Sequence, residues 1–212
     1  MGYKLAYPVV SADGTKVGFT GVSLGSSHVY DVVADGICVL SPRHHPPVRF
    51  CNCGFYSFTS VDSALALACD SRYRSAVLLE VLGSGRYVRY EEGLRCSRQR
   101  IRTVRVGRCS CGRAADVLVD AGTGQKGWRR LVGACTLCAG WRPALTLDAF
   151  ARMAGHDLHV GRAEAGSDAS GSGPEESDPD RMVPVLAAEV ALLQARLDEL
   201  QEHVDRLSHL EQ

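Results

Sequence analysis

The sequence predicts a mainly β protein with short helices, an α+β fold that ends in a long C-terminal helix. Three observations carry this prediction. Short apolar runs alternate with glycines up to residue 106, which is typical of an antiparallel sheet. Two cysteine pairs then flank two further runs of this kind, and a heptad repeat of apolar residues occupies the end of the chain.

We expect strands at five apolar runs before residue 107, which are 17–22, 29–33, 76–82, 87–90 and 101–106. Gly83-Ser84-Gly85 lies between two of them and predicts a hairpin turn. One helix interrupts this region: Ser60 is a suitable N-cap, and the alanines and leucines that follow it favour helix.

The segment from Cys109 to Cys138 contains strand-like runs at 115–119 and 128–132, which predict a single hairpin between the two cysteine pairs. Its glycine-rich loop matches the dinucleotide-binding string Gly-x-Gly-x-x-Gly, but a strand follows where that motif requires a helix. We therefore interpret the glycines as a hairpin loop. A short helix capped by Thr146 and ending at Gly155 should follow.

Four regions follow from this pattern: a β-rich domain at 1–106, a ribbon with a short helix at 107–160, a disordered acidic linker at 161–181 and a coiled coil at 182–212. The linker has few apolar residues and many acids, so it cannot bury enough surface to fold. In the coil, valine dominates the a positions and leucine fills the d positions, which favours a parallel two-stranded dimer. The alternative is one amphipathic helix lying on the folded domain. The heptad residues are Val183, Leu186, Val190, Leu193, Leu197, Leu200, Val204 and Leu207.

The composition is 45% hydrophobic, which excludes a wholly disordered chain. We find no signal-peptide pattern and no apolar stretch long enough to span a bilayer, so we expect a soluble, cytoplasmic protein that does not bind membranes. In a reducing cytoplasm the nine cysteines are better explained as metal ligands or buried thiols than as disulfides.

The two cysteine pairs around the predicted hairpin form the clearest metal motif. Cys109-x-Cys111-Gly112 is followed by Cys135-x-x-Cys138, which is the spacing of two metal-binding turns joined by a hairpin. Four thiolates in tetrahedral arrangement suit Zn²⁺, and a glycine after the second cysteine allows the tight turn. A site closed by four protein ligands has no position for water or substrate, so this zinc should be structural.

A second metal site is predicted around Cys51-x-Cys53-Gly54. Cys38 and His45 are the nearest residues that complete a Cys₃His set, with Cys96 and His44 as substitutes. The alternative is a pair of packed thiols beside a surface histidine.

Several motifs in this region resemble a family of small uncharacterised actinobacterial domains. They are His45-Pro-Pro, Cys51-Asn-Cys-Gly-Phe-Tyr56, the run from Ala76 to Val88 with its Gly-Arg pair, and Glu92-Gly-Leu-Arg95. The family combines a His-x-x-Pro segment with Cys-x-Cys-Gly and a valine-rich hairpin, over about residues 28–106 of this chain. The resemblance brings no known activity. It implies a folded unit that holds His45, Cys51 and Cys53 together.

The net charge of zero conceals an asymmetry: residues 71–142 carry 15 basic and 5 acidic side chains, whereas 143–212 carry 5 basic and 14 acidic ones. The stretch 95–108 contains six arginines and no acid, and on a strand Arg98, Arg100 and Arg102 would share one face. Such a row suits phosphate contacts; the alternative is an ordinary solvated face that pairs with the acidic tail. The six candidate nucleic-acid contacts are Arg95, Arg98, Arg100, Arg102, Arg105 and Arg108.

Together these features predict a non-enzymatic, zinc-stabilised dimer that regulates by binding DNA, RNA or the transcription machinery through its arginine-rich β face. The alternative is a protein-interaction adaptor, in which the coil binds a partner helix and zinc is purely structural. We do not expect an enzyme, because the motifs supply neither paired carboxylates nor an open metal site.

Overall fold

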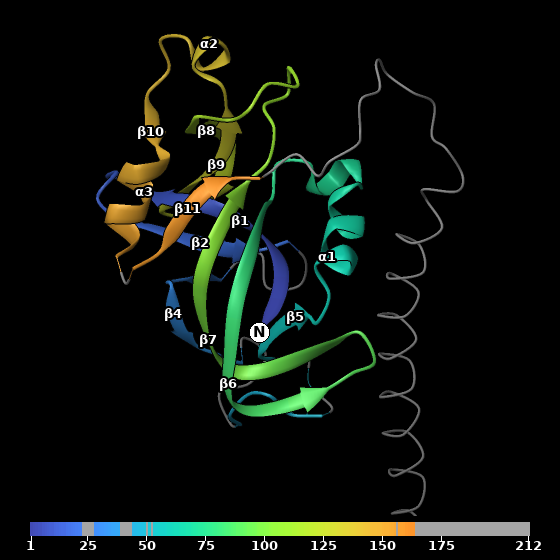
Figure 1. The fold of residues 1–212 in the computed structure, drawn as a ribbon. Helices are drawn as coiled ribbons and strands as arrows, with labels where there is room; N and C mark the ends of the chain where they lie inside the picture. The colour runs from blue at the N-terminus through green and yellow to red at the C-terminus, as the bar shows by residue number, and fades with distance from the viewer. Residues whose placement is uncertain (23–27, 39–43, 50, 52, 156, 164–212) are drawn as a thin grey trace, which may run out of the picture.

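A computed structural model describes residues 1–22, 28–38, 44–49, 51, 53–155 and 157–163 (Figure 1). The predicted coiled coil, with all eight of its heptad residues, lies outside the described residues, as does the predicted acidic linker from Glu164 onward. Gly161 and Arg162, with which that linker was expected to begin, are the last residues of strand β11 (His159–Arg162).

The mainly β, mostly antiparallel character is confirmed. The described strands form one 11-stranded sheet, whose main path runs β10-β8-β9-β1-β5-β7-β11. All of its pairings are antiparallel except that between β11 and β7. The other strands on this path are β1 (Gly2–Ser11), β5 (Phe55–Phe58), β7 (Gly93–Val106), β8 (Val117–Gln125), β9 (Trp128–Ala134) and β10 (Ala144–Thr146).

The central strand, β1 (Gly2–Ser11), is one that the sequence pattern did not reveal. It pairs with β5, β6, β9 and β2 (Val17–Gly21), and β2 in turn pairs with β3 (Val29–Tyr30). Leu5 to Val10 are buried consecutively, so they show no apolar–polar alternation. Because β9 pairs with β1, strands from both sides of the predicted boundary at residue 106 belong to one sheet.

The longest hairpin is formed by β6 (Val77–Arg89) and β7 (Gly93–Val106), and β4 (Val33–Asp35) pairs with β7. The predicted turn at Gly83-Ser84-Gly85 is wrong, because β6 runs through these glycines and the chain reverses between Arg89 and Gly93. The register shifts between Ser84 and Tyr87, which places Gly85 in a β-bulge, whereas Gly83 is paired with Gln99 before it. A side chain at Gly83 would lie 3.0 Å from the sulfur of Cys96.

Two predicted helix starts are confirmed. Helix α1 (Val61–Ala68) begins after Ser60, whose side chain accepts a hydrogen bond from the amide of Asp62, and the short helix η1 (Ser71–Tyr73) follows it. Helix α3 (Leu147–Ala154) begins after Thr146, whose side chain accepts from Ala149, and Gly155 ends it. Helix α2 (Thr136–Ala139) is a single turn inside the ribbon.

An aromatic core holds the sheet around α3. Phe150 of α3 is fully buried, and its ring lies edge-on to that of Phe19, with centroids 5.7 Å apart. Tyr30 contacts both Phe19 and Phe55, which links β2 and β3 to β5. No helix in the described residues has both the length and the apolar character needed to cross a lipid bilayer.

Candidate metal centres

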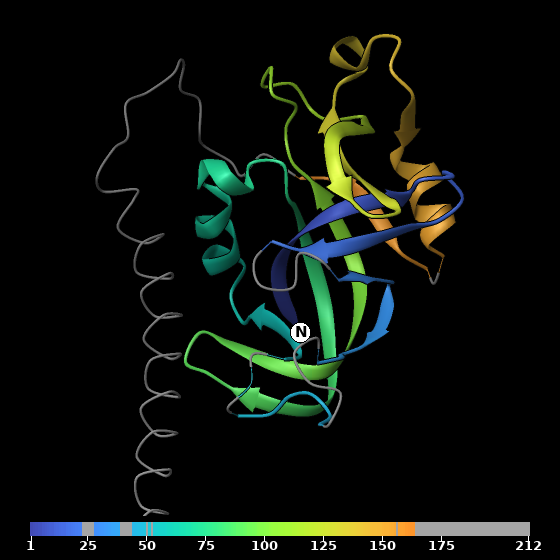
Figure 2. The ribbon, with the colours of Figure 1, turned by 180° about the vertical axis from the view of Figure 1, so that it is seen from behind.

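The described residues contain two groups of side chains that can hold a metal ion. Each group consists of four ligand atoms that all lie within 4.8 Å of one another. The first group precedes β5, beside the bent β6–β7 hairpin, and the second surrounds α2; the two lie at opposite ends of the fold (Figures 1 and 2). Together they use seven of the nine cysteines and one histidine.

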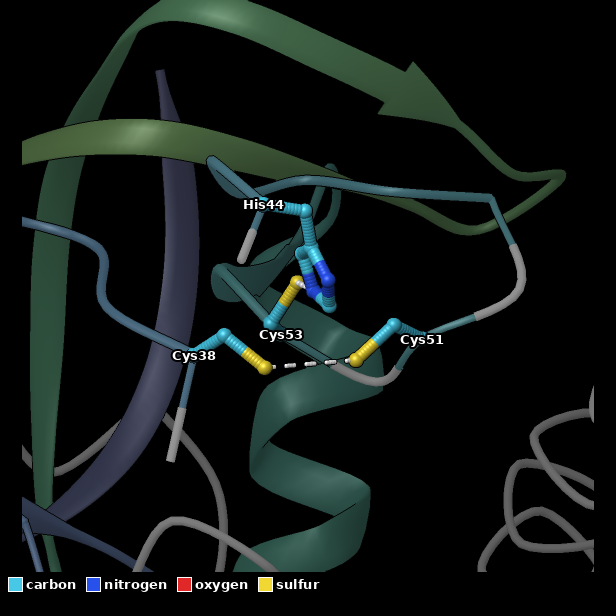
Figure 3. Close-up of side chains that lie close together, drawn as sticks. All are labelled: Cys38, His44, Cys51 and Cys53. Carbon is cyan, nitrogen blue, oxygen red and sulfur yellow. Dashed lines mark hydrogen bonds between the residues drawn. The ribbon is translucent and has the colours of Figure 1, made fainter. Parts of the chain in front are cut away.

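The first group is formed by Cys38, His44, Cys51 and Cys53, which point toward a common centre (Figure 3). The sulfurs of Cys38 and Cys51 are 3.5 Å apart, and Nε2 of His44 lies 3.3 Å from the sulfur of Cys53. Cys38 follows β4, whereas Cys51 and Cys53 precede β5. β4 and β5 both pair with β7, so β7 brings the segment of Cys38 close to that of Cys51 and Cys53.

The structure brings His44 into this group in place of the predicted His45. The side chain of His45 is exposed, and its carbonyl oxygen accepts a hydrogen bond of 2.7 Å from Arg86. A Cys-x-Cys spacing cannot choose between neighbouring histidines. Counted from His44, however, the chain reads His-x-x-Pro as far as Pro47, and this spacing is the sequence signal that could have indicated His44.

Two arginines fix the loop that carries these ligands. Arg86 binds the carbonyl oxygens of His45 and Pro46, at 2.7 and 3.2 Å. Arg95 donates to the carbonyl oxygen of Cys51 and, at 3.1 Å, to that of Val48. Since backbone carbonyls of the ligand loop accept these bonds, both arginines position the metal ligands.

The sequence pattern had predicted that Arg95 is a nucleic-acid contact, but the structure does not expose it. Its side chain is fully buried, and the guanidinium carbon lies 5.1 and 5.7 Å from the ring centroids of Tyr56 and Tyr90. Register explains the placement, because Tyr56 of β5 is paired directly with Arg95 of β7 and shares its face. Gly54 lets the loop approach: it has φ 105°, and a side chain there would lie 3.1 Å from Cγ of Arg95.

The second group is the predicted ribbon set, Cys109, Cys111, Cys135 and Cys138. The sulfurs of Cys111 and Cys135 are 3.7 Å apart. In the first turn, Gly112 has φ 83° and its amide donates to the carbonyl of Cys109, as expected for the glycine after the second cysteine. In the second turn, Cys135 is the N-cap of α2, and its sulfur accepts from the amide of Cys138.

The thiols of the two groups differ in acidity. In the ribbon, hydrogen bonding from the backbone at Cys111 lowers the pKa of Cys109 to about 6. The pKa of Cys138 is raised to about 12, chiefly by its contact with Cys111, so a proton is retained among these sulfurs when no metal is bound. In the first group, burial raises the pKa of Cys51 to about 11.

Both ligand sets fit a tetrahedral ion. Sulfurs bound at about 2.3 Å to a tetrahedral metal lie about 3.8 Å apart, and those of Cys111 and Cys135 are 3.7 Å apart. A nitrogen ligand binds at about 2.0 Å, which shortens the expected separation, as seen between His44 and Cys53. Each set supplies four protein ligands, which is the number that a tetrahedral ion takes.

The remaining predicted arginine contacts lie on or just after β7. Arg98, Arg100 and Arg102 are exposed, and Arg98 lies 3.7 Å from the carboxylate of Asp35. The alternation of exposed and buried side chains along β7 is interrupted after Arg102, because β7 has one extra residue there opposite β6. Arg105 is bound to Glu80 at 2.6 Å, and Arg108 donates to the carbonyl of Gly112. The exposed row therefore consists of Arg98, Arg100 and Arg102, which we call the arginine row.

No family model, curated protein or solved structure matches this chain significantly. The resemblance of residues 28–106 to a small actinobacterial domain stays a prediction.

Proposed function

We propose that both ligand groups bind Zn²⁺ and that the chain is a non-enzymatic, zinc-stabilised regulator that binds nucleic acid through the arginine row. The ligand chemistry supports zinc: sets of four thiolates, or of three thiolates and an imidazole, in closed tetrahedral arrangement are typical of structural zinc sites. Thiolate ligands are maintained in a reducing compartment, which favours the cytoplasm.

The observation that carries the nucleic-acid proposal is the exposure of the arginine row on a strand fixed at both ends by a metal-ligand group. β7 pairs with β5 near the first group, and three residues beyond the end of β7 the chain reaches Cys109 of the ribbon. A strand held in this way presents its guanidinium groups at fixed spacing, and guanidinium groups bind phosphate oxygens well.

The arginine row can be tested by replacing Arg98, Arg100 and Arg102 together with alanine. Each phosphate contact releases counterions, so losing three contacts should reduce the slope of log affinity against log salt by about 2 to 3. Binding of random-sequence DNA and RNA should be measured at several salt concentrations, with zinc content measured alongside. A matched control removes the same charge elsewhere, by replacing the exposed Lys16, Arg74 and Arg152.

Equal losses in the two triple variants would show that only overall charge matters, which contradicts a defined site. If the unchanged protein binds neither DNA nor RNA at low salt, the nucleic-acid proposal fails. The protein-interaction adaptor, with zinc purely structural, would then replace it.

We further propose that the chain is a homodimer through its heptad repeat at 183–207. A chain shortened to residues 1–163 retains all the described strands and should sediment as a monomer. If the shortened chain still sediments as a dimer, the folded region associates by itself and the coil is free to bind a partner helix.

A further inference from the structure

The ribbon carries two large apolar side chains on its outer surface. Leu137 lies between the two ligands of the second turn and is 72% exposed, and Trp141 follows three residues after Cys138 and is fully exposed. Tryptophan is strongly buried on average in folded proteins. Neither side chain belongs to the small core beneath α2, which contains Cys135, Ala139 and Val117. We call Leu137 and Trp141 the ribbon tip.

The ribbon tip is held in a defined turn. The amide of Ala139 donates to the carbonyl of Cys135 at 2.9 Å, and Gly140 reverses the chain with φ 56°. Arg142 then folds back, and its guanidinium donates to the carbonyls of Cys138 at 2.8 Å and Ala139 at 3.3 Å. Trp141 is therefore presented to solvent by a turn that the metal ligands and Arg142 both fix.

The two ligand turns of the ribbon carry basic side chains. The segments 107–115 and 133–147, which form the two ligand turns and their flanks, contain Arg108, Arg113 and Arg142 and no aspartate or glutamate. All three arginines are exposed. An exposed aromatic ring among cationic side chains is the combination that binds single-stranded nucleic acid, because bases stack on the ring while arginines contact the phosphates.

We propose that the ribbon tip binds single-stranded nucleic acid, with one base stacked on Trp141 and neighbouring phosphates on the ribbon arginines. This inference rests on the proposed nucleic-acid function and extends it from β7 to the ribbon. A paired and stacked base does not offer a free face to an indole ring, so the tip selects unpaired strands. A stable protein interface needs about 800 Å² on each partner, far more than two side chains provide.

The experiment follows the fluorescence of Trp141 directly. Trp128 is the only other tryptophan, so Trp128→Phe in the full chain leaves Trp141 as the sole reporter. Titration with oligothymidylate and with oligouridylate at low salt should quench this fluorescence. In the chain with both tryptophans, Trp141→Ala should weaken binding of these oligonucleotides about 5- to 150-fold, and Trp141→Phe should weaken it less.

Zinc content of Trp141→Ala must equal that of the unchanged chain, which shows that the turn remains formed. Leu65→Ala on α1 truncates an exposed apolar side chain outside the ribbon, and as a control it should bind these oligonucleotides as tightly as the unchanged chain.

Three outcomes are distinguishable. Quenching together with the loss of affinity supports the proposal. If the chain binds oligonucleotides through the arginine row but Trp141→Ala binds as tightly and the fluorescence is unchanged, the tip is not a nucleic-acid site and is left as a protein contact. If the chain binds no nucleic acid at all, the proposed function fails and this inference fails with it.

Discussion

The two metal-ligand groups use similar side chains but are assembled in different ways. In the ribbon, two cysteine pairs flank one hairpin, and local backbone hydrogen bonds orient the sulfurs, as between Cys138 and Cys135. In the first group, three separate segments supply the ligands, and Arg86 and Arg95 of the β6–β7 hairpin hold the loop from outside. One site is built by local turn chemistry, whereas the other depends on long-range packing.

The largest effect should come from removing a ribbon ligand. Cys135→Ser removes both a metal ligand and the N-cap sulfur of α2, so the turn around α2 should unfold, because metal binding and folding are coupled in so small a unit. Hydrogen exchange should show lost protection at 109–146. Cys51→Ser should spare that region and affect the loop before β5; exchange that rises equally in both regions in either variant would contradict independent sites.

The ligand histidine gives the next test. His44→Ala should lower zinc affinity of the first group by more than about 100-fold, since it removes a ligand rather than a supporting group, for which 10- to 100-fold losses are usual. His45→Ala is the matched control and should bind zinc normally, because only its carbonyl is engaged. Competition with a chelator of known affinity measures both. The opposite ranking would restore His45 as the ligand.

Replacing Arg95 tests whether hydrogen bonds from β7 to the ligand loop contribute to the zinc affinity of the first group. Arg95→Ala removes the donors to the carbonyls of Cys51 and Val48, and we expect it to lower zinc affinity of the first group by about 10- to 100-fold. Arg98→Ala, three residues along the same strand and exposed, should leave zinc binding unchanged. Zinc titrations of the two variants decide the matter. Equal zinc affinity in Arg95→Ala and Arg98→Ala would show that the loop keeps its shape without Arg95.

The contrast between local turn chemistry and long-range packing also explains which ligands and elements could be predicted from the sequence. All four ribbon ligands follow from Cys-x-Cys-Gly and Cys-x-x-Cys, and the helix starts follow from Ser60 and Thr146, because each of these signals acts within a few residues. The first group was predicted only in part: Cys38, Cys51 and Cys53 were expected, but His44 was named only as a substitute for His45.

The wrong predictions share that cause. Arg95 resembled its exposed neighbours in sequence, and only the pairing of β5 with β7 and the loop above it bury the side chain. Gly83 and Gly85 resembled a hairpin turn, but β6 continues through both of them alongside β7, with a bulge at Gly85. In each case a contact distant in the chain decided the outcome, and no local pattern reports such a contact.

The central claim, that both groups are structural zinc sites, is tested most directly by native mass spectrometry of the purified full chain. The account predicts two zinc ions per chain in the unchanged protein, one in Cys135→Ser and one in Cys51→Ser. A folded chain that carries no metal, or a single ion that Cys51→Ser does not remove, would contradict it.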